Sequence, residues 1–112
     1  EETRQNTITN AFLKKLKEFI EDNCANEKFG ILDLCDEFAV SQSTLYRKVK
    51  SLTGLSTQEF ITEVKLQKAL EIFNQDETLS LKEIGYKVGF LNYTHFGKLF
   101  EQRYGKQLSN NT

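Results

Sequence analysis

Apolar residues recur along this chain at the three-to-four-residue spacing of a helix, in segments that short polar turns separate. The first segment carries five apolar residues on one helical face: Phe12, Leu13, Leu16, Phe19 and Ile20. This stripe predicts an amphipathic helix that ends in the polar turn before Lys28. Five more segments with helical signals follow it, so we expect an all-α protein with six helices.

A short turn separates the second and third predicted helices. The second is short and has one inward face made of Ile31, Leu34, Cys35 and Phe38. The chain turns at Ala39 and Val40, after which Ser41 can cap the third helix. Gly54 ends that helix, at the position where a left-handed residue is expected. The predicted buried stripe of the third helix is Leu45, Val49 and Leu52.

A long fourth helix joins the two halves of the chain. It opens with a capping box, in which Ser56 and Glu59 satisfy each other's backbone amides. Its apolar positions are Phe60, Ile61, Val64, Leu66, Leu70 and Phe73. The pattern runs to about Asn74, which predicts a rod of about 18 residues and roughly 27 Å, long enough to separate two lobes.

The last two predicted helices again have clear start signals. Ser80 and Glu83 form a second capping box ahead of a short fifth helix. Asn92 can cap the sixth helix, and Gly105 ends it. The inward residues of these two helices are Ile84 and Val88, and then Phe96, Leu99 and Phe100.

The second half of the chain repeats the first. The pairs at an offset of 50 are Leu34 with Ile84, Phe38 with Val88, and Val40 with Phe90. After one extra residue in the second turn, the pairs at an offset of 51 are Leu45 with Phe96, Val49 with Phe100, and Gly54 with Gly105. A small residue, Cys35 and then Gly85, lies where two crossing helices must approach closely. Each half is therefore predicted to be a helix-turn-helix unit.

In such a unit the second helix enters the major groove, with its buried stripe toward the first helix and its opposite face toward the bases. In the first unit that face carries polar, long or basic side chains: Gln42, Ser43, Tyr46, Arg47 and Lys50. In the second unit the face is chemically quieter, with Tyr93, Thr94, Gly97, Lys98 and Glu101. If the fourth helix sets the two recognition helices roughly 34 Å apart, a monomer can enter successive major grooves.

The charge of the chain is segregated by segment. The net charge of −1 alone argues against nucleic-acid binding, because neutralising phosphates requires clustered Lys and Arg. From Ser41 to Gly54, however, the chain holds three basic residues and no acid. From residue 92 to residue 106 it holds three basic residues against one acid, while many of the acids lie in the first third.

Several function classes lack support in this sequence. No glycine-rich phosphate loop, paired carboxylate site or nucleophile-base set is present, so no enzyme and no cofactor is expected. Cys24 and Cys35 have no partner at metal-ligand spacing and are interpreted as reduced core residues. His95 lacks partners for catalysis or metal binding, which leaves a groove-facing or helix-packing role. No membrane span, signal segment or small-molecule site is predicted.

At these motifs the sequence resembles the C-terminal DNA-binding domain of the AraC/XylS family of transcriptional regulators. The resemblance covers residues 29 to 105. It is carried by LYRKVKSLTG at 45–54, EFI at 59–61, LQKA at 66–69, IGYKVGF at 84–90, and the spacing of Phe96, Phe100, Tyr104 and Gly105. It implies tandem, homeodomain-like helix-turn-helix subdomains joined by a long linker helix, here with an extra N-terminal amphipathic helix.

The resemblance extends to output domains of hybrid two-component sensor proteins, which would add N-terminal sensing, kinase and receiver domains as partners. Two features depart from the family. Its usual Ser-Pro pair appears here as Ser56-Thr57 and as Gln107-Leu108, and its common Arg ahead of Leu66 is Lys65. The second Ser-Pro change leaves open whether the short final helix of the family is present.

The family implies which side chains meet DNA. The base contacts carried over are Ser43, Tyr46, Arg47, Asn92, Tyr93, Thr94 and Lys98. The phosphate contacts expected from charge and helix position are Ser41, Gln42, Lys48, Lys50, Arg103 and Lys106. Arg47 is the leading base contact, because a guanidinium can bind guanine O6 and N7 together. Each side chain also has an ordinary alternative as an exposed or core-packing residue.

The sequence thus predicts four segments: an N-terminal helix and turn (1–28), a first helix-turn-helix (29–55), a linker helix (56–75), and a second helix-turn-helix with a tail (76–112). The expected function is sequence-specific binding of double-stranded DNA and regulation of transcription. Activation through RNA polymerase is favoured, and the compartment would be the cytoplasm. The alternative is a protein-interaction module that kept the fold without DNA affinity.

Overall fold

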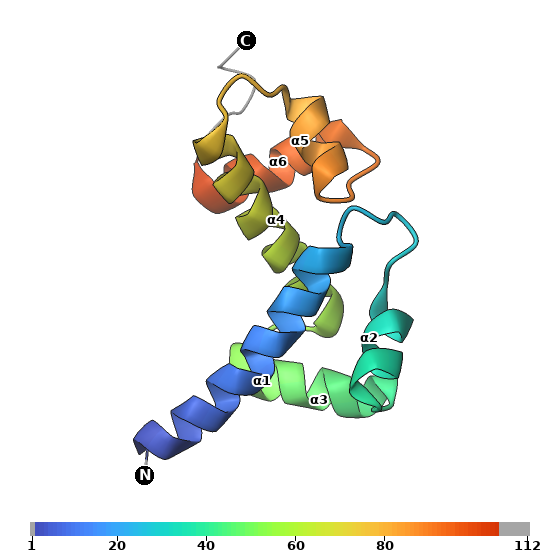
Figure 1. Ribbon diagram of the computed structural model, residues 1–112, viewed down its shortest axis with the longest axis vertical. Coiled ribbons are helices and arrows are strands. Elements are labelled where there is room, and N and C mark those ends of the chain that lie inside the picture. Colours follow the sequence, from blue (N-terminus) through green and yellow to red (C-terminus); the bar gives the residue numbers. More distant parts are fainter. Residues whose placement is uncertain (1, 106–112) are drawn as a thin grey trace. The chain divides into compact units, whose positions relative to one another are not determined.

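The computed structural model describes the backbone of residues 2–105 and the side chains of residues 11–105. The described chain contains six helices and no strand (Figure 1), which confirms the all-α prediction. The helices are α1 (Glu2–Asn23), α2 (Ile31–Phe38), α3 (Gln42–Thr53), α4 (Thr57–Gln75), α5 (Leu81–Lys87) and α6 (Tyr93–Tyr104). No helix in residues 2–105 is long and apolar enough to cross a membrane.

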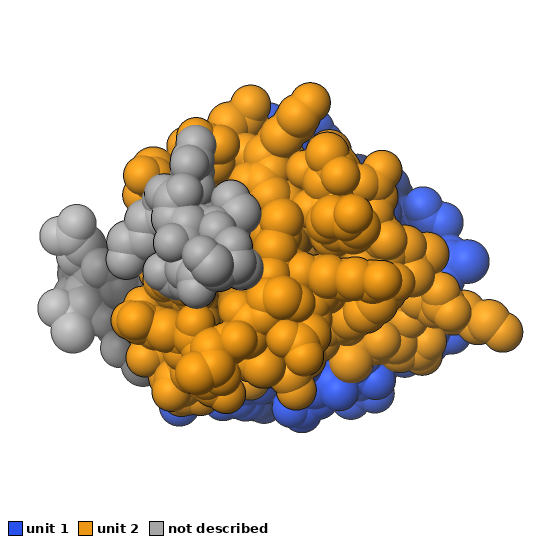
Figure 2. All heavy atoms as spheres, turned by 90° about the horizontal axis from the view of Figure 1, so that it is seen from above, with its two compact units in different colours: residues 1–23, 29–64 blue, residues 24–28, 65–112 orange. Residues whose placement is uncertain are grey.

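The described residues divide into two compact units, which Figure 2 shows in two colours. Unit 1 consists of residues 2–23 and 29–64, and unit 2 consists of residues 24–28 and 65–105. Helix α4 therefore contributes its first part to unit 1 and the remainder to unit 2. The connection between α1 and α2 is likewise shared between the units, because its residues 24–28 belong to unit 2 and its remaining residues belong to unit 1.

Unit 1 has a mainly aliphatic core that four helices build. Its buried members are Leu16, Ile20, Leu34, Cys35, Leu45, Val49, Ile61 and Val64. Helix α2 packs against both α1 and α3. Phe38 extends this core toward α1, where its ring meets the Phe12 and Phe19 rings edge-on, with centroids 5.9 and 6.2 Å away. Each fully buried large side chain contributes roughly 1.5–3 kcal/mol through burial.

Unit 2 has a core that is richer in aromatic rings. Its buried members are Cys24, Leu66, Ala69, Phe73, Ile84, Val88, Phe96 and Phe100. Phe96 is fully buried and packs between Phe90 and Phe100, with ring centroids 5.1 and 5.9 Å away. A Cβ atom at Gly85 would lie 3.3 Å from the Phe96 ring, so this glycine lets α5 and α6 approach closely, as expected.

The helix boundaries follow the predicted caps. The Ser41 and Asn92 side chains accept hydrogen bonds from the Thr44 and His95 backbone amides, at 3.2 and 3.0 Å. Gly54 and Gly105 both adopt the left-handed conformation that ends α3 and α6. The two capping boxes are also present, at the pairs Ser56 with Glu59 and Ser80 with Glu83.

Two details differ from the sequence-based expectation. Leu52, the third member of the predicted α3 stripe, is 37% exposed, whereas Leu45 and Val49 are fully buried. The core of unit 1 therefore covers only part of α3. Gly97 was expected on the open face of α6, but it is half-buried, and a Cβ atom there would lie 3.2 Å from the Leu81 side chain. The close packing of α5 on α6 turns this position inward.

Candidate nucleic-acid interface

Helix α3 presents a polar and basic surface opposite its buried stripe. Leu45 and Val49 face the core of unit 1 with no exposed surface. The side chains on the outward surface, all of them exposed, are Gln42, Ser43, Tyr46, Arg47 and Lys50. Because α3 contains three basic residues and no acid, this surface is suited to contact a polyanion.

Both lysines of α3 also make contacts within unit 1. Lys50 Nζ donates a hydrogen bond to the Gly54 carbonyl oxygen at 3.1 Å, so it helps to end its own helix. Lys48 Nζ lies 4.7 Å from the centroid of the Phe12 ring, in a cation-π contact with α1. Arg47 is exposed beside them. Among the three basic residues of α3, Arg47 is thus exposed near the middle of the helix, next to the exposed Tyr46.

Helix α6 presents the corresponding surface of unit 2. Its buried side is Phe96 and Phe100, and its exposed residues include Tyr93, Thr94, Lys98 and Glu101. Arg103 lies over the ring of its neighbour Tyr104, with its guanidinium carbon 5.3 Å from the ring centroid. Since Glu101 partly offsets the two basic residues, α6 is the less basic of the two recognition helices.

His95 is an exposed α6 residue outside the predicted DNA contacts. It lies in the first turn of the helix, where its backbone amide donates to Asn92 Oδ1. The sequence allowed either a groove-facing or a helix-packing position for this side chain, and the structure shows it exposed. The sequence does contain a signal for this exposure, because His95 directly precedes Phe96 and so lies one position off the buried stripe. Lys106 and the question of a final helix lie outside the described residues.

The start of each recognition helix is organised by its cap. Ser41 and Asn92 are both exposed and bind an amide of the first turn through their side-chain oxygens. The positive end of the helix dipole lies at this point and favours an anion such as a phosphate group. Each cap therefore satisfies one amide of the first turn and in this way serves folding.

Helices α4 and α5 each have, in their first turn, a glutamate whose pKa is lowered. Hydrogen bonds from the Ser56 backbone and side chain lower the pKa of Glu59, and the equivalent bonds from Ser80 lower the pKa of Glu83. Both shifts favour the charged carboxylate that closes the capping box. In unit 2, burial lowers the pKa of Lys65, whose Nζ lies 5.6 Å from the centroid of the Phe90 ring.

No group of three or more potential metal ligands occurs within the described part of the chain. The described residues form two helix pairs, α2 with α3 and α5 with α6, each with an outward polar face on its second helix.

Residues 34–110 match the family model described as a helix-turn-helix domain. The chain belongs to the AraC-type helix-turn-helix family. That is a family of DNA-binding transcription regulators rather than of enzymes.

Relatives of this AraC-type domain include longer bacterial proteins. The chain is 34% identical over 100 residues to histidine kinase P4 of Formosa agariphila, covering 89% of this chain and 7% of that protein. It is 33% identical over 92 residues to the HTH-type transcriptional activator RhaS of Escherichia coli O1:K1 / APEC, covering 82% of this chain and 32% of that protein. The chain thus spans less than a third of each of these relatives.

Solved structures share the fold of this AraC-type domain. A DNA-binding transcriptional dual regulator from Escherichia coli K-12 superposes with a TM-score of 0.74 at 22% identity, covering 87% of this chain and 90% of that chain. The C-terminal domain of AraT, a response regulator from Geobacillus stearothermophilus, superposes with a TM-score of 0.72 at 21% identity, covering 88% and 80%. The tandem helix-turn-helix fold predicted from the sequence is confirmed.

Proposed function

We propose that this domain binds double-stranded DNA sequence-specifically and activates transcription by placing α3 and α6 in successive major grooves. The observation that carries the proposal is the outward face of α3, which is exposed, basic and free of acids. In a helix-turn-helix unit this is the face that meets the bases. Membership of a family of DNA-binding regulators supports the same function.

The length of α4 is compatible with two recognition helices on one face of DNA. Its 19 residues correspond to roughly 28 Å at the rise of an α-helix. Successive turns of the major groove are about 34 Å apart, so a helix of this length fits between two neighbouring contacts. We therefore propose that one copy of the domain reads two half-sites.

The proposed base contacts are Ser43, Tyr46 and Arg47 from α3, and Asn92, Tyr93, Thr94 and Lys98 from the start and outer face of α6. The proposed phosphate contacts within the described residues are Ser41, Gln42, Lys48, Lys50 and Arg103. Arg47 has the central role, because its guanidinium can donate two hydrogen bonds to one guanine. Lys48 and Lys50 would reach phosphate by giving up, or sharing, their contacts with Phe12 and Gly54.

The partners that we propose follow from this activity and from the longer relatives. Activation requires contact with RNA polymerase. The match to a histidine kinase over a small part of its length supports a place behind N-terminal sensing and receiver domains. A domain that reads bacterial DNA would act in the cytoplasm, and in a hybrid sensor it would lie at the cytoplasmic end of a membrane protein.

The test is selection from a pool of random duplexes, followed by fluorescence anisotropy on the selected duplex and a scrambled control across a salt series. We expect the selected duplex to bind at least about a thousandfold more tightly than the scrambled one. We also expect affinity to fall steeply with salt, since each neutralised phosphate adds about 0.9 to the slope. Failure to bind either duplex at low salt would reject the proposal.

The alternative function is a protein-interaction module without DNA affinity. The near-neutral net charge of −1 and the acidic α2, which has Asp33, Asp36 and Glu37 and no base, favour this alternative. The two functions differ in the role of α3. If the domain binds DNA, Arg47→Glu should abolish DNA binding. If it is a protein-interaction module, the same substitution should leave the binding of a protein partner to α2 unaffected.

A further inference from the structure

The turn between α5 and α6 fixes the direction in which the second recognition helix starts. Gly89 has a φ angle of 86°, a left-handed conformation that glycine adopts readily. Its backbone amide donates to the Tyr86 carbonyl oxygen, and the Phe90 amide donates to the Gly85 carbonyl oxygen, at 3.1 and 2.8 Å. Helix α6 begins at Tyr93, three residues after Phe90, so any movement of this turn moves the helix.

A segment from a distant part of the sequence packs against this turn. Cys24, which directly follows α1, is buried in unit 2 and has its thiol 3.9 Å from the Lys87 carbonyl oxygen. A Cβ atom placed on Gly89 would lie 1.8 Å from the Cys24 carbonyl oxygen. The Cys24 backbone therefore contacts the turn so closely that only glycine fits there.

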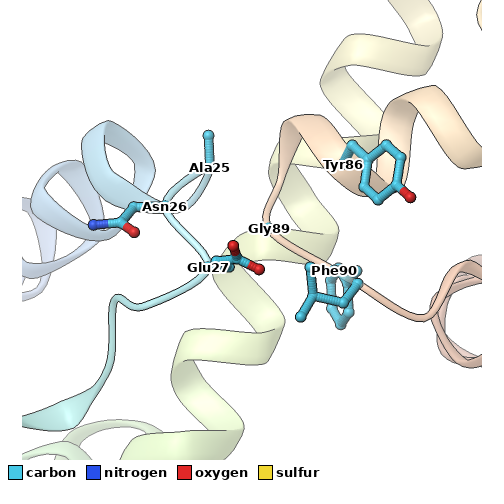
Figure 3. Close-up of a pocket in the computed structure, with 7 residues that line it drawn as sticks. Ala25, Asn26, Glu27, Tyr86, Gly89 and Phe90 are labelled. Carbon is cyan, nitrogen blue, oxygen red and sulfur yellow. The ribbon is translucent and has the colours of Figure 1, made fainter.

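The rest of the 24–28 segment lies along the same turn. Figure 3 shows Ala25 and Glu27 across from Gly89 and Phe90, at the edge of an open hollow of about 450 Å³. Lys65 of α4 approaches from within unit 2, with its Nζ 3.6 Å from the position of a Gly89 Cβ atom. Contacts from residues 24 and 65 thus hold the turn in place.

The equivalent turn of unit 1 differs. Ala39 falls on Gly89 at the repeat offset and has a left-handed φ angle of 54°. Ala39 is exposed, however, and it carries the side chain that Gly89 cannot have. The fold of a helix-turn-helix therefore does not by itself require a backbone packed against its turn, and the Cys24 contact is an addition specific to unit 2.

We propose that Cys24 is a positioning residue for the second recognition helix. Its carbonyl group and thiol hold the Lys87–Gly89 turn, and the turn orients α6 toward its half of the DNA site. This inference rests on the proposed DNA-binding function. It makes base recognition by α6 dependent on the chain that follows α1, while recognition by α3 is independent of it.

The experiment compares the base preferences of variants of the whole chain, measured by sequencing duplexes selected from a random pool. Arg47→Ala and Lys98→Ala first identify the half-sites read by α3 and α6. Gly89→Ala is the main variant. Gly54→Ala is its matched control, because Gly54 has a similar φ angle of 79° but no atom within 4 Å of its Cβ position.

We expect Gly89→Ala to reduce preference in the α6 half-site by about tenfold or more, the loss from at least one misread base pair, while the α3 half-site is unchanged. Gly54→Ala should change preference in either half by less than about threefold. Equal effects of the two substitutions, or equal loss in both half-sites, would overturn the positioning role. A wild-type domain that selects no sequence would instead overturn the proposed function, and this proposal with it.

A second pair of variants covers the case in which Gly89→Ala does not fold. Cys24→Ala removes the thiol that meets the Lys87 carbonyl group, and Cys24→Ser keeps a donor there. Loss of preference in the α6 half-site for Cys24→Ala, with recovery for Cys24→Ser, is the expected result. Unchanged preference in both variants, or loss that Cys24→Ser does not recover, would contradict the role of the thiol in holding the turn.

Discussion

The two helix-turn-helix units share a backbone plan but differ in what surrounds it. The Val40 amide donates to the Cys35 carbonyl oxygen in unit 1, and the Phe90 amide donates to the Gly85 carbonyl oxygen in unit 2, which are the same bond at an offset of 50. Unit 1 encloses a mainly aliphatic core, and its turn at Ala39 is exposed. Unit 2 encloses an aromatic core, and its turn is packed against Cys24.

The difference shows that the neighbours of a backbone position, as well as its φ angle, decide which residue it accepts. Ala39 and Gly89 both have a positive φ angle, which costs an alanine about 1–2 kcal/mol. At Ala39 the φ angle is the only cost, because the methyl group is exposed and meets no packed neighbour. At Gly89 the Cys24 carbonyl oxygen occupies the place of a side chain.

The recognition helices differ in chemistry as well. Arg47 and Lys50 of α3 correspond to Lys98 and Glu101 of α6 at the repeat offset of 51. The first helix thus has a guanidinium and an ammonium group where the second has an ammonium group and a carboxylate. We therefore expect α3 to contribute more of the DNA affinity, and the following changes test that expectation together with the difference in the cores.

The largest expected effect comes from equivalent core positions. Phe96→Ala should lower the free energy of unfolding by about 3–5 kcal/mol, and Leu45→Ala by about 2–5 kcal/mol, because both side chains are fully buried. Urea unfolding measures the totals. Amide exchange should place the main loss of protection in α5 and α6 for Phe96→Ala, and in α2 and α3 for Leu45→Ala. The same pattern of lost protection in both variants would show that the units do not have separate cores.

The next effect compares Arg47 with its equivalent Lys98. Arg47→Ala should weaken binding to the selected duplex by about 1–3 kcal/mol and relax preference at one base pair, because a bidentate contact to guanine is lost. Lys98→Ala should cost less than about 1 kcal/mol, since an ammonium group is a point charge without the fork geometry. Anisotropy titrations on selected and random duplexes measure both. An equal loss on random DNA for Arg47→Ala would rule out a base contact.

A smaller effect is expected from making the two helices alike at one position. Glu101→Lys gives α6 the charge that Lys50 gives α3, so all duplexes should bind somewhat more tightly. The slope of affinity against salt should become steeper by about 0.9 if the new lysine meets a phosphate. A salt series on random duplex DNA measures the slope. An unchanged slope would indicate that this turn of α6 lies away from the DNA backbone.

The smallest effect concerns the capping boxes, one in each unit. The pKa values of Glu59 and Glu83 lie below their ordinary value of 4.5, because hydrogen bonds from Ser56 and Ser80 stabilise the carboxylates. Their contribution to stability is therefore present above about pH 4.5 and is lost as the pH falls through the folded-state pKa. Glu59→Gln and Glu83→Gln should each reduce the loss of stability between neutral pH and about pH 3. Urea midpoints at several pH values test this, and a wild-type pH dependence in both variants would contradict it.

Much of the fold follows from local sequence signals. The caps at Ser41 and Asn92 and the two capping boxes are local patterns, so the sequence predicts where the helices begin. The pairing of each short helix with a longer one follows from the repeat. How far the neighbouring helices cover α3 and α6 does not follow from local signals. For that reason Leu52 was wrongly placed in the buried stripe of α3, and Gly97 was wrongly placed on the exposed face of α6.

The candidate site was only partly predictable for the same physical reason. Periodicity separates the inward face of α3 from its outward face, which identified Tyr46 and Arg47. It does not reveal contacts between residues far apart in sequence. The Lys48 contact with Phe12 and the Cys24 contact with Gly89 both arise in this way, across 36 and 65 positions of the chain. The base and phosphate contacts themselves stay predictions.

The central claim is that one copy of this domain reads DNA with both recognition helices. Hydroxyl-radical footprinting on the selected duplex, at a measured stoichiometry of one domain per site, tests it most directly. The account predicts two protected patches on one face of the duplex, about one helical repeat or 10–10.5 base pairs apart. Arg47→Ala should weaken one patch, and Lys98→Ala the other. A single protected patch, or none, would contradict the claim.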